Sequence, residues 1–256
     1  MKSRLALLIL CGVLTAASGC SKRPTRPAVR LDTLRAHEQY TLVHTVAPGE
    51  TLRTVADLYY GDPERAAEIA AVNELRDPDR LSAGDDLRLV FSEDEWASAE
   101  RRYQARQPYN RGVDALASGR LEAAEAAFDE ALAIDPDFDD ARYNLALVQL
   151  RRGRNEAAES LLVALRERRP DDPDVLAALG NSLFFQTRFA ESIAVFRDLL
   201  DVDPRHRQGA YGLARALGEA GMVESAITAW EDYLRLDGDS AWATRARQQL
   251  RELRGE

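Results

Sequence analysis

One set of residues recurs every 34 positions through the second half of the chain. It combines small residues, bulky apolar residues four positions later, turn residues and prolines. The members are Ala124, Ala158, Ser192 and Ala226; Phe128, Leu162, Phe196 and Trp230; Gly119, Gly153, Thr187 and Gly221; and Pro136, Pro170 and Pro204. Small residues let two helix backbones approach, and a bulky residue four positions on lies on the same helical face and fills the remaining gap. This period therefore predicts stacked helix-turn-helix units, which hold partners more often than they catalyse.

The pattern resembles the tetratricopeptide repeat family in four consecutive units. The resemblance implies a mainly α-helical fold, a right-handed helical solenoid with units at residues 105–138, 139–172, 173–206 and 207–240. The first unit departs from the family pattern at Pro108 and Arg111, and the fourth has Gly238 where a proline would fall. Terminal repeats are expected to be atypical, and we expect a polar-faced capping helix within residues 241–256.

The N-terminus has the pattern of a secretory signal. Lys2 and Arg4 precede an apolar run of about ten residues, too short to span a bilayer, and Ala-Ser-Gly-Cys follows. The cysteine after three small residues resembles the bacterial lipoprotein signal. That resemblance implies that residues 1–19 are removed and that Cys20 is lipidated, which would anchor the chain to a membrane. The alternative is an ordinary signal with a chance cysteine.

Residues 20–40 are polar, basic and proline-bearing, so we expect a lipidated tether. Ser21 follows the lipidated position, and by the same resemblance this favours the outer membrane. The expected location is therefore the cell envelope, with the chain anchored in the inner leaflet of the outer membrane and facing the periplasm.

The composition argues against several classes of partner and chemistry. The formal net charge is −9, which is unfavourable for binding nucleic acid. After removal of the signal, Cys20 is the remaining cysteine, and its sulfur would carry lipid. The three histidines are scattered, and the sequence has no metal-ligand spacing, phosphate loop or nucleophile motif. We predict no catalytic residue, no metal and no cofactor, and we do not expect an enzyme.

A second module is predicted at residues 41–91. Alternating residues at 42–46 and 86–90 predict two short strands, with helical stretches at 53–60 and 64–73 between them. This strand-helix-helix-strand order resembles the LysM domain over its whole length. The residues that carry the resemblance are Val46, Gly49, Glu50, Thr51, Leu52, Ala56, Tyr60, Gly61, Asp62, Ile69, Asn73, Asp77, Pro78, Leu81, Gly84 and Leu87. The family binds polymers that contain N-acetylglucosamine, which in a bacterial envelope implies peptidoglycan.

The same resemblance places a sugar-binding groove between the first strand-helix loop and the second helix-strand loop. One wall would carry Gly49, Glu50, Thr51 and Leu52, and the other Asn73, Glu74, Leu75, Arg76, Asp79, Arg80 and Leu81. Backbone amides and short polar side chains suit acetamido and hydroxyl groups, while Leu52 and Leu75 would contact the sugar face. The alternative is a domain that keeps only the fold and acts as a spacer.

Residues 92–104 predict a connecting helix. Ser92 and Glu95 have the spacing of a capping box. Trp96 and Tyr103 share one helical face, so we expect them to pack on a neighbouring element.

In the repeat family, the inner surface comes from fixed positions of each first helix. These positions include Tyr109, Asn110, Tyr143, Asn144, Leu147, Arg151, Asn181, Phe184, Tyr211 and Arg215. We predict that they bind an unidentified protein or peptide, because tyrosines give contact area at low entropy cost and asparagines pair with a peptide backbone. The alternative is that several of the aromatic side chains pack against the neighbouring repeat.

These modules together predict a lipid-anchored scaffold of the cell envelope. It would bind peptidoglycan through the LysM module and a protein through the repeats. The alternative function is an accessory or assembly subunit of a secretion or polysaccharide-export complex, in which the LysM module is structural.

Overall fold

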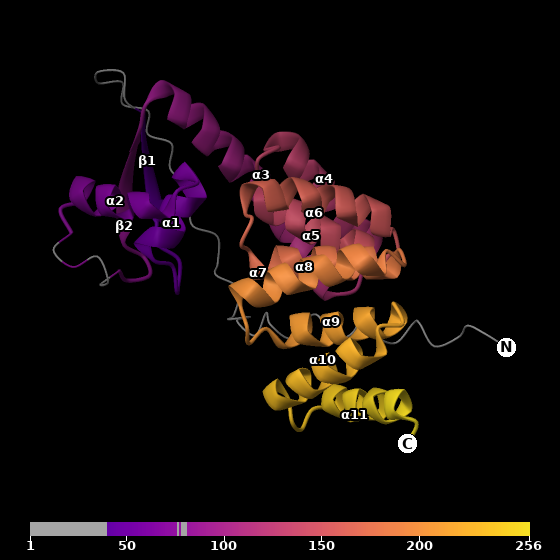
Figure 1. Ribbon diagram of the computed structural model, residues 1–256. Helices are drawn as coiled ribbons and strands as arrows, with labels where there is room; N and C mark the ends of the chain where they lie inside the picture. Colours follow the sequence, from indigo (N-terminus) through magenta and orange to yellow (C-terminus); the bar gives the residue numbers. More distant parts are fainter. Residues whose placement is uncertain (1–39, 76, 78–80) are drawn as a thin grey trace. The chain divides into compact units, whose positions relative to one another are not determined.

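The computed structural model describes residues 40–75, 77 and 81–256, which fall into two compact units (Figure 1). The first unit ends at Gln107 and the second begins at Pro108. The predicted signal, Cys20 and the tether up to residue 39 lie outside the described residues, whereas Tyr40, predicted as the end of the tether, begins the first strand. Within the described ranges, no helix is both long enough and apolar enough to cross a membrane.

The first unit is a two-stranded antiparallel sheet with its helices inserted between the strands. The elements are β1 (Tyr40–Thr45), α1 (Leu52–Tyr60), the 3-10 helix η2 (Pro63–Arg65), α2 (Ala66–Val72) and β2 (Asp86–Phe91). Pairing runs from Tyr40 opposite Phe91 to Thr45 opposite Asp86. Apolar residues of both strands and both helices form one buried core. The predicted strand-helix-helix-strand order is confirmed.

Local signals explain where α1 begins and ends. The Thr51 hydroxyl accepts a hydrogen bond from the backbone N–H of Thr54, and the Thr54 hydroxyl accepts one from the N–H of Thr51. This reciprocal cap satisfies two donors that a helix start leaves open. Gly61 ends the helix in the left-handed region, with φ of 68°.

Helix α3 (Glu93–Ala117) is continuous where the sequence predicted a connecting helix at 92–104 and a separate first repeat helix. Pro108 lies inside it and removes one backbone donor. Gly112, four residues further on, lies inside the helix and does not adopt a positive φ, so no left-handed turn residue ends the helix near the proline.

The first part of α3 packs on the first unit. Trp96 stacks on Tyr40 with 5.4 Å between ring centroids, and Tyr103 packs against the same core. Glu95 accepts hydrogen bonds from the backbone N–H of Ser92 and from Arg65. The predicted capping pair and the packing of Trp96 and Tyr103 are confirmed.

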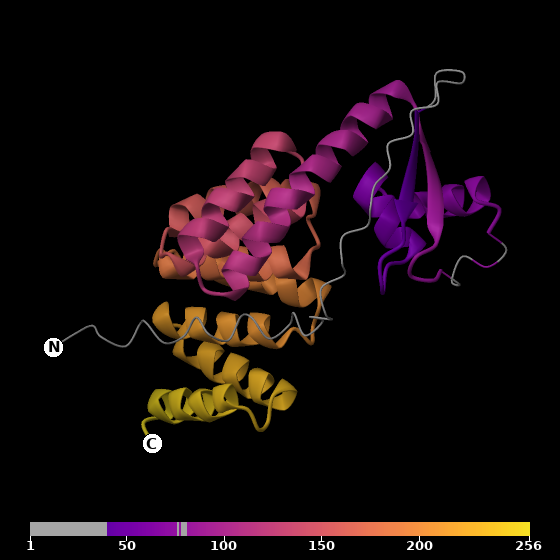
Figure 2. The same ribbon diagram turned by 180° about the vertical axis from the view of Figure 1, so that it is seen from behind.

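The second unit is a stack of antiparallel helix pairs, which Figures 1 and 2 show from opposite sides. The first helices are the later part of α3, α5 (Asp139–Arg151), α7 (Pro173–Phe185) and α9 (Arg207–Glu219). The second helices are α4 (Leu121–Ile134), α6 (Asn155–Arg168), α8 (Phe189–Val202) and α10 (Val223–Leu236), and α11 (Ala241–Arg254) follows them. The predicted solenoid of four pairs and a final helix is confirmed.

The recurring small and bulky residues occupy the helix contacts. Ala124, Ala158, Ser192 and Ala226 are all 0% exposed, as are Phe128, Leu162 and Phe196. A Cβ on Gly212 would come within 2.4 Å of the Phe196 ring, and one on Gly180 within 2.7 Å. These glycines therefore let a phenylalanine lie directly against two helix backbones.

Each helix pair is joined by a tight turn in which one residue has a positive φ. Gly119, Gly153 and Gly221 have φ of 71°, 71° and 73°, and Thr187 at the corresponding place has φ of 61°. A β-branched residue rarely adopts this conformation, so the turn of the third unit is strained.

Ion pairs join the first three units. Glu125 accepts from Arg154 and lies 2.7 Å from Arg152, and 34 positions later Glu159 accepts from Arg188 at 2.6 Å. Another 34 positions on, the place of the glutamate holds Ile193 and the place of the arginine holds Met222. Both are apolar, so this ion pair does not recur between the third and fourth units.

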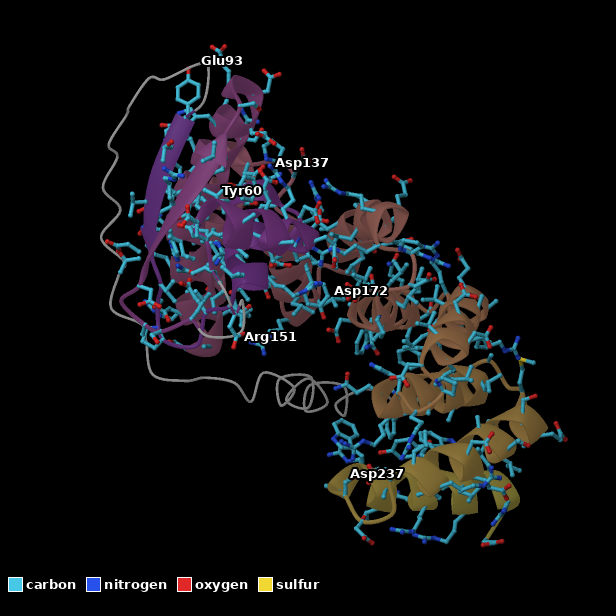
Figure 3. The ribbon with its side chains drawn as sticks, turned by 90° about the vertical axis from the view of Figure 1, so that its left-hand side faces the viewer. Tyr60, Glu93, Asp137, Arg151, Asp172 and Asp237 are labelled. Carbon is cyan, nitrogen blue, oxygen red and sulfur yellow. The ribbon has the colours of Figure 1, made fainter. Side chains whose placement is uncertain are left out.

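The turn between α10 and α11 is held by the carboxylate of Asp237, which is labelled in Figure 3. It accepts from the Tyr233 hydroxyl at 2.5 Å and from the backbone and hydroxyl of Ser240. Ser240 in turn caps α11 by accepting from Trp242 and Ala243. These contacts secure the end of the unit that lacks the recurring proline.

Candidate binding surfaces

The two loops expected to bind a sugar meet at one end of the sheet. Thr45 ends β1 opposite Asp86, which begins β2. The backbone N–H of Val46 donates to Asp85, and the N–H of Gly84 donates to the carbonyl of Val46, both at 2.8 Å. The loop after β1 and the loop before β2 are thus directly hydrogen-bonded to each other.

Glu50 points into the first unit. Its Oε2 lies 2.8 Å from Nε2 of the buried His44 and accepts from the backbone N–H of Ala47 at 2.7 Å. Nδ1 of His44 lies 3.1 Å from the hydroxyl of Tyr59. Because a carboxylate only accepts, Nε2 of a neutral His44 carries the proton and Nδ1 accepts from Tyr59. The Glu50 carboxylate therefore holds the loop to β1 and α1.

The ionisation of this cluster follows from its surroundings. Partial burial would raise the pKa of Glu50, but hydrogen bonds from His44 and Ala47, together with the positive charge of Arg106, hold that pKa below its ordinary value. Burial is the main cause that raises the pKa of the Tyr59 hydroxyl, and the electrostatic effects of Tyr103 and Glu50 add to it. Glu50 is consequently ionised at neutral pH.

The other predicted residues of this first wall differ in exposure. Gly49 is exposed with φ of 85°, and a Cβ there would meet no atom within 4 Å. Thr51 is exposed and uses its hydroxyl to cap α1. Leu52 is only 3% exposed and belongs to the core. The prediction that Leu52 contacts a sugar face is therefore wrong, because its side chain fills the space under α1.

Asn73 on the second wall is committed to the fold. Its Nδ2 donates to the carbonyls of Ile69 and Arg88, both at 2.8 Å, and its Oδ1 accepts from the N–H of Arg88 at 2.7 Å. These bonds tie the end of α2 to β2. Asn73 thus has a structural task that the sequence analysis did not predict.

The rest of the second wall is mixed. Glu74 is exposed and has φ of 53°, while Leu75 and Leu81 are half-buried and pack against the core. Arg76, Asp79 and Arg80 lie outside the described residues. Among the described wall residues, Gly49, Thr51 and Glu74 are therefore the exposed ones that a ligand at this end of the sheet could meet.

His44 and Tyr59 are site-supporting residues that sequence reasoning did not single out. A signal for His44 was present, because it alternates with Leu42 and Val46 and so shares their buried face. No comparable signal identified Tyr59, since its partner lies 15 positions away.

In the second unit, the inward-facing residues of the first repeats contact one another. The Tyr109 ring lies 4.7 Å from that of Phe138, and its hydroxyl accepts from Asn144 at 3.1 Å. Asn110 is exposed. The Asn144 amide therefore already donates one hydrogen bond to Tyr109 within the repeats.

Tyr143 and Leu147 are half-buried and pack against the core of the following repeats. Burial, followed by the charges of Asp174 and Asp172, raises the pKa of the Tyr143 hydroxyl. Arg151 donates weakly to the carbonyl of Leu116 at 3.4 Å. The sequence left open whether these aromatic side chains bind a partner or pack against the neighbouring repeat. In the structure, Tyr109 and Tyr143 pack against the neighbouring repeat.

The later repeats place aromatic and cationic groups together. Arg215 lies over the ring of Phe184 at 4.1 Å, and Tyr211 contacts Trp230, Tyr233 and Trp242. Asn181 is half-buried on the same helix as Phe184. Across the described residues, no three His, Cys, Asp or Glu side chains gather in a way that could hold a metal ion.

Comparison with known families assigns both units. A LysM domain model matches residues 44–90, and two tetratricopeptide repeat models match residues 115–181 and 177–241. A protein of Deinococcus radiodurans described as uncharacterised is 40% identical over 47 residues. That match covers 18% of this chain and 19% of the relative.

Solved structures resemble the helical part. MamA has a TM-score of 0.54 at 18% identity, over 59% of this chain and 82% of that one. A tetratricopeptide repeat protein from Parabacteroides merdae ATCC 43184 has a TM-score of 0.53 at 17% identity, over 59% of this chain and 60% of that one. At these identities the likeness shows the fold alone.

Proposed function

We propose that this chain, a LysM domain followed by tetratricopeptide repeats, is a lipid-anchored scaffold of the cell envelope. Its LysM domain would bind peptidoglycan and its repeats would bind a protein. The observation that carries the proposal is the presence of both modules, in this order, in one chain. LysM domains commonly bind peptidoglycan, and tetratricopeptide repeats commonly bind proteins.

The geometry of the first unit supports the glycan-binding part. The loops after β1 and before β2 are joined by backbone hydrogen bonds, and the Glu50 carboxylate fixes the first of them from inside. A preorganised loop loses little freedom when a ligand binds. Gly49 leaves open space in which a sugar could approach the backbone.

One observation favours the alternative function, in which the LysM domain is structural. Leu52 and Asn73, two of the predicted wall residues, serve the core and the α2–β2 junction instead. A secretion or polysaccharide-export subunit would then use the domain as a spacer.

Sedimentation with purified sacculi separates these functions. Gly49→Asn would place a side chain in the open space of the loop, and we expect several-fold less protein in the pellet. Gly119→Asn is the matched control, because Gly119 has a similar positive φ and open surroundings but lies in the first repeat turn. Pelleting that is absent in the wild type, or that Gly49→Asn leaves unchanged, would favour the structural role.

The anchor is tested by fractionation. The Cys20→Ser variant should be absent from the membrane fraction after a salt wash, because Cys20 would carry all of the lipid chains. Retention of the variant in the membrane would place the anchor elsewhere.

A further inference from the structure

Aromatic and arginine side chains form a continuous row across α7 and α9, the first helices of the last two repeats, and the final helix α11. Arg215 lies 4.1 Å from the ring centroid of Phe184 and 6.0 Å from that of Tyr211. The Tyr211 ring lies 5.0 Å from that of Trp242, and Arg245 lies 5.1 Å from the Trp242 ring. We call Phe184, Arg215, Tyr211, Trp242 and Arg245 the aromatic-arginine row.

The two guanidinium groups of the row differ from most arginines of the repeats. Arg152, Arg154 and Arg188 each form an ion pair with a glutamate of the preceding unit. Among the described residues, neither Arg215 nor Arg245 has a carboxylate within 4.0 Å, and each is stacked on an aromatic ring instead. Both therefore keep donors available for an incoming acceptor.

Arg215 is the more desolvated of the two. Burial lowers the pKa of Arg215, while the nearby Tyr211 and Glu219 oppose that shift. Arg245 is exposed. Burial raises the pKa of the Tyr211 hydroxyl, and the positive charges of Arg215 and Arg245 oppose that shift.

We propose that the aromatic-arginine row docks an acidic segment of a protein partner. Asp or Glu side chains of that segment would pair with Arg215 and Arg245, and its apolar side chains would cover Phe184 and Trp242. Planar guanidiniums bind carboxylates through two parallel hydrogen bonds, and the aromatic rings that hold them reduce the freedom lost on pairing. The inference rests on the proposed protein-binding role of the repeats.

The charge of the chain argues for a peptide over a nucleic acid. A nucleic acid also offers anions and stacking groups, but its phosphates demand a broad basic surface. Here the net charge is −9, and the row supplies two cations, one of which, Arg215, also feels the negative charge of Glu219. Two separate carboxylates of one segment match this arrangement better than a continuous line of phosphates.

The test measures fluorescence anisotropy of labelled peptides with the purified full-length protein. The probe is an amidated ten-residue peptide rich in Asp and Phe, and its matched peptide has Asn in place of every Asp. We expect the acidic peptide to bind about tenfold more tightly, with quenching of Trp242 emission. Arg215→Gln should remove about tenfold in affinity, and Arg245→Gln about threefold because Arg245 is exposed.

Arg197→Gln is the charge-matched control, because Arg197 is exposed on α8 and outside the row. It should leave affinity unchanged. Thermal unfolding checks each variant, and Arg215→Lys keeps the charge if Arg215→Gln does not fold; it should then retain part of the preference for Asp. Three results would overturn the inference. They are an equal loss of affinity in Arg197→Gln, equal affinity for the two peptides, and equally tight binding of a single-stranded oligonucleotide.

Failure here is distinguishable from failure of the proposed function. If the row does not select acidic peptides but Tyr211→Ala weakens binding of the Asn peptide, the repeats still bind peptides and only the acidic preference is wrong. Pelleting with sacculi reports on the LysM domain independently.

Discussion

The LysM domain and the repeats use polar side chains in opposite ways. In the LysM domain, Glu50 and Asn73 turn inward and hold loops in place. In the later repeats and the final helix, the half-buried Arg215 and the exposed Arg245 stack on aromatic rings and have no carboxylate partner in the described chain. A small domain has little apolar surface to bury, so its loops need hydrogen bonds, whereas stacked helices are fixed by apolar contact and leave surface groups free.

The largest expected effect concerns the apolar contact between stacked helices. Ala158→Glu would bury a charge at a position that is 0% exposed, and it should destabilise the repeats by about 3 kcal/mol or more. Ala157→Glu on the exposed side of the same helix is the control and should change little. Denaturant unfolding followed by helical circular dichroism measures both. Similar losses for the two variants would mean that the helix contact is misplaced.

A smaller loss is expected when a loop-holding side chain of the LysM domain is removed. Asn73→Ala deletes three hydrogen bonds at the α2–β2 junction and should cost about 2 kcal/mol within that domain. Hydrogen exchange of Asp86–Phe91 should accelerate, while exchange in the repeats stays the same. Glu74→Ala, at an exposed neighbour, is the control. Unchanged exchange together with lost pelleting on sacculi would make Asn73 a sugar contact instead.

The third prediction concerns acid. The pKa of folded Glu50 lies below its ordinary value of 4.5, so its stabilising contribution is fully present above that value and is lost as the pH falls through the folded pKa. Glu50→Gln should cost about 1 kcal/mol at neutral pH and should flatten the acid side of the stability profile of the LysM domain. Unfolding of the full-length chain between neutral pH and pH 3, followed by hydrogen exchange of Tyr40–Thr45, measures this. An unchanged profile would show that the ionised Glu50 carboxylate does not stabilise the LysM domain.

The smallest effect concerns the strained turn of the third unit. Thr187→Gly relieves the left-handed strain but increases the freedom of the unfolded chain, so we expect a net gain of about 0.5 kcal/mol. Gly153→Thr, the reverse change in the second unit, should destabilise the repeats. Thermal unfolding measures both. Loss of stability in Thr187→Gly would indicate that the threonine makes a compensating contact.

The sequence predicted the repeats well because one spacing fixes both the packing and the turns. Ala158, Phe196 and Gly153 each recur for a separate physical reason, and all lie where the period places them. The continuous α3 was not predicted, because Pro108 suggested a helix start and a proline inside a helix is less common.

The binding loops were predicted in position but not in side-chain direction. The resemblance located Gly49, Glu50 and Asn73 on loops that do meet. It did not show that Glu50 turns toward His44 or that Leu52 is buried, because those directions depend on tertiary contacts between strand and helix. The arginine contacts across α7, α9 and α11 likewise appear only when the helices are stacked.

The ion pairs between units also affect how the chain could grow by duplication. Arg154 pairs with Glu125 of the preceding unit, but the place of that glutamate in the third unit holds Ile193, and the fourth unit has Met222 in place of the arginine. A copy of the third unit inserted between the first and second units would place Ile193 in front of Arg154, which would then lose its glutamate partner. The units are therefore not interchangeable, because the ion pairs at their junctions form only when the units follow one another in the present order.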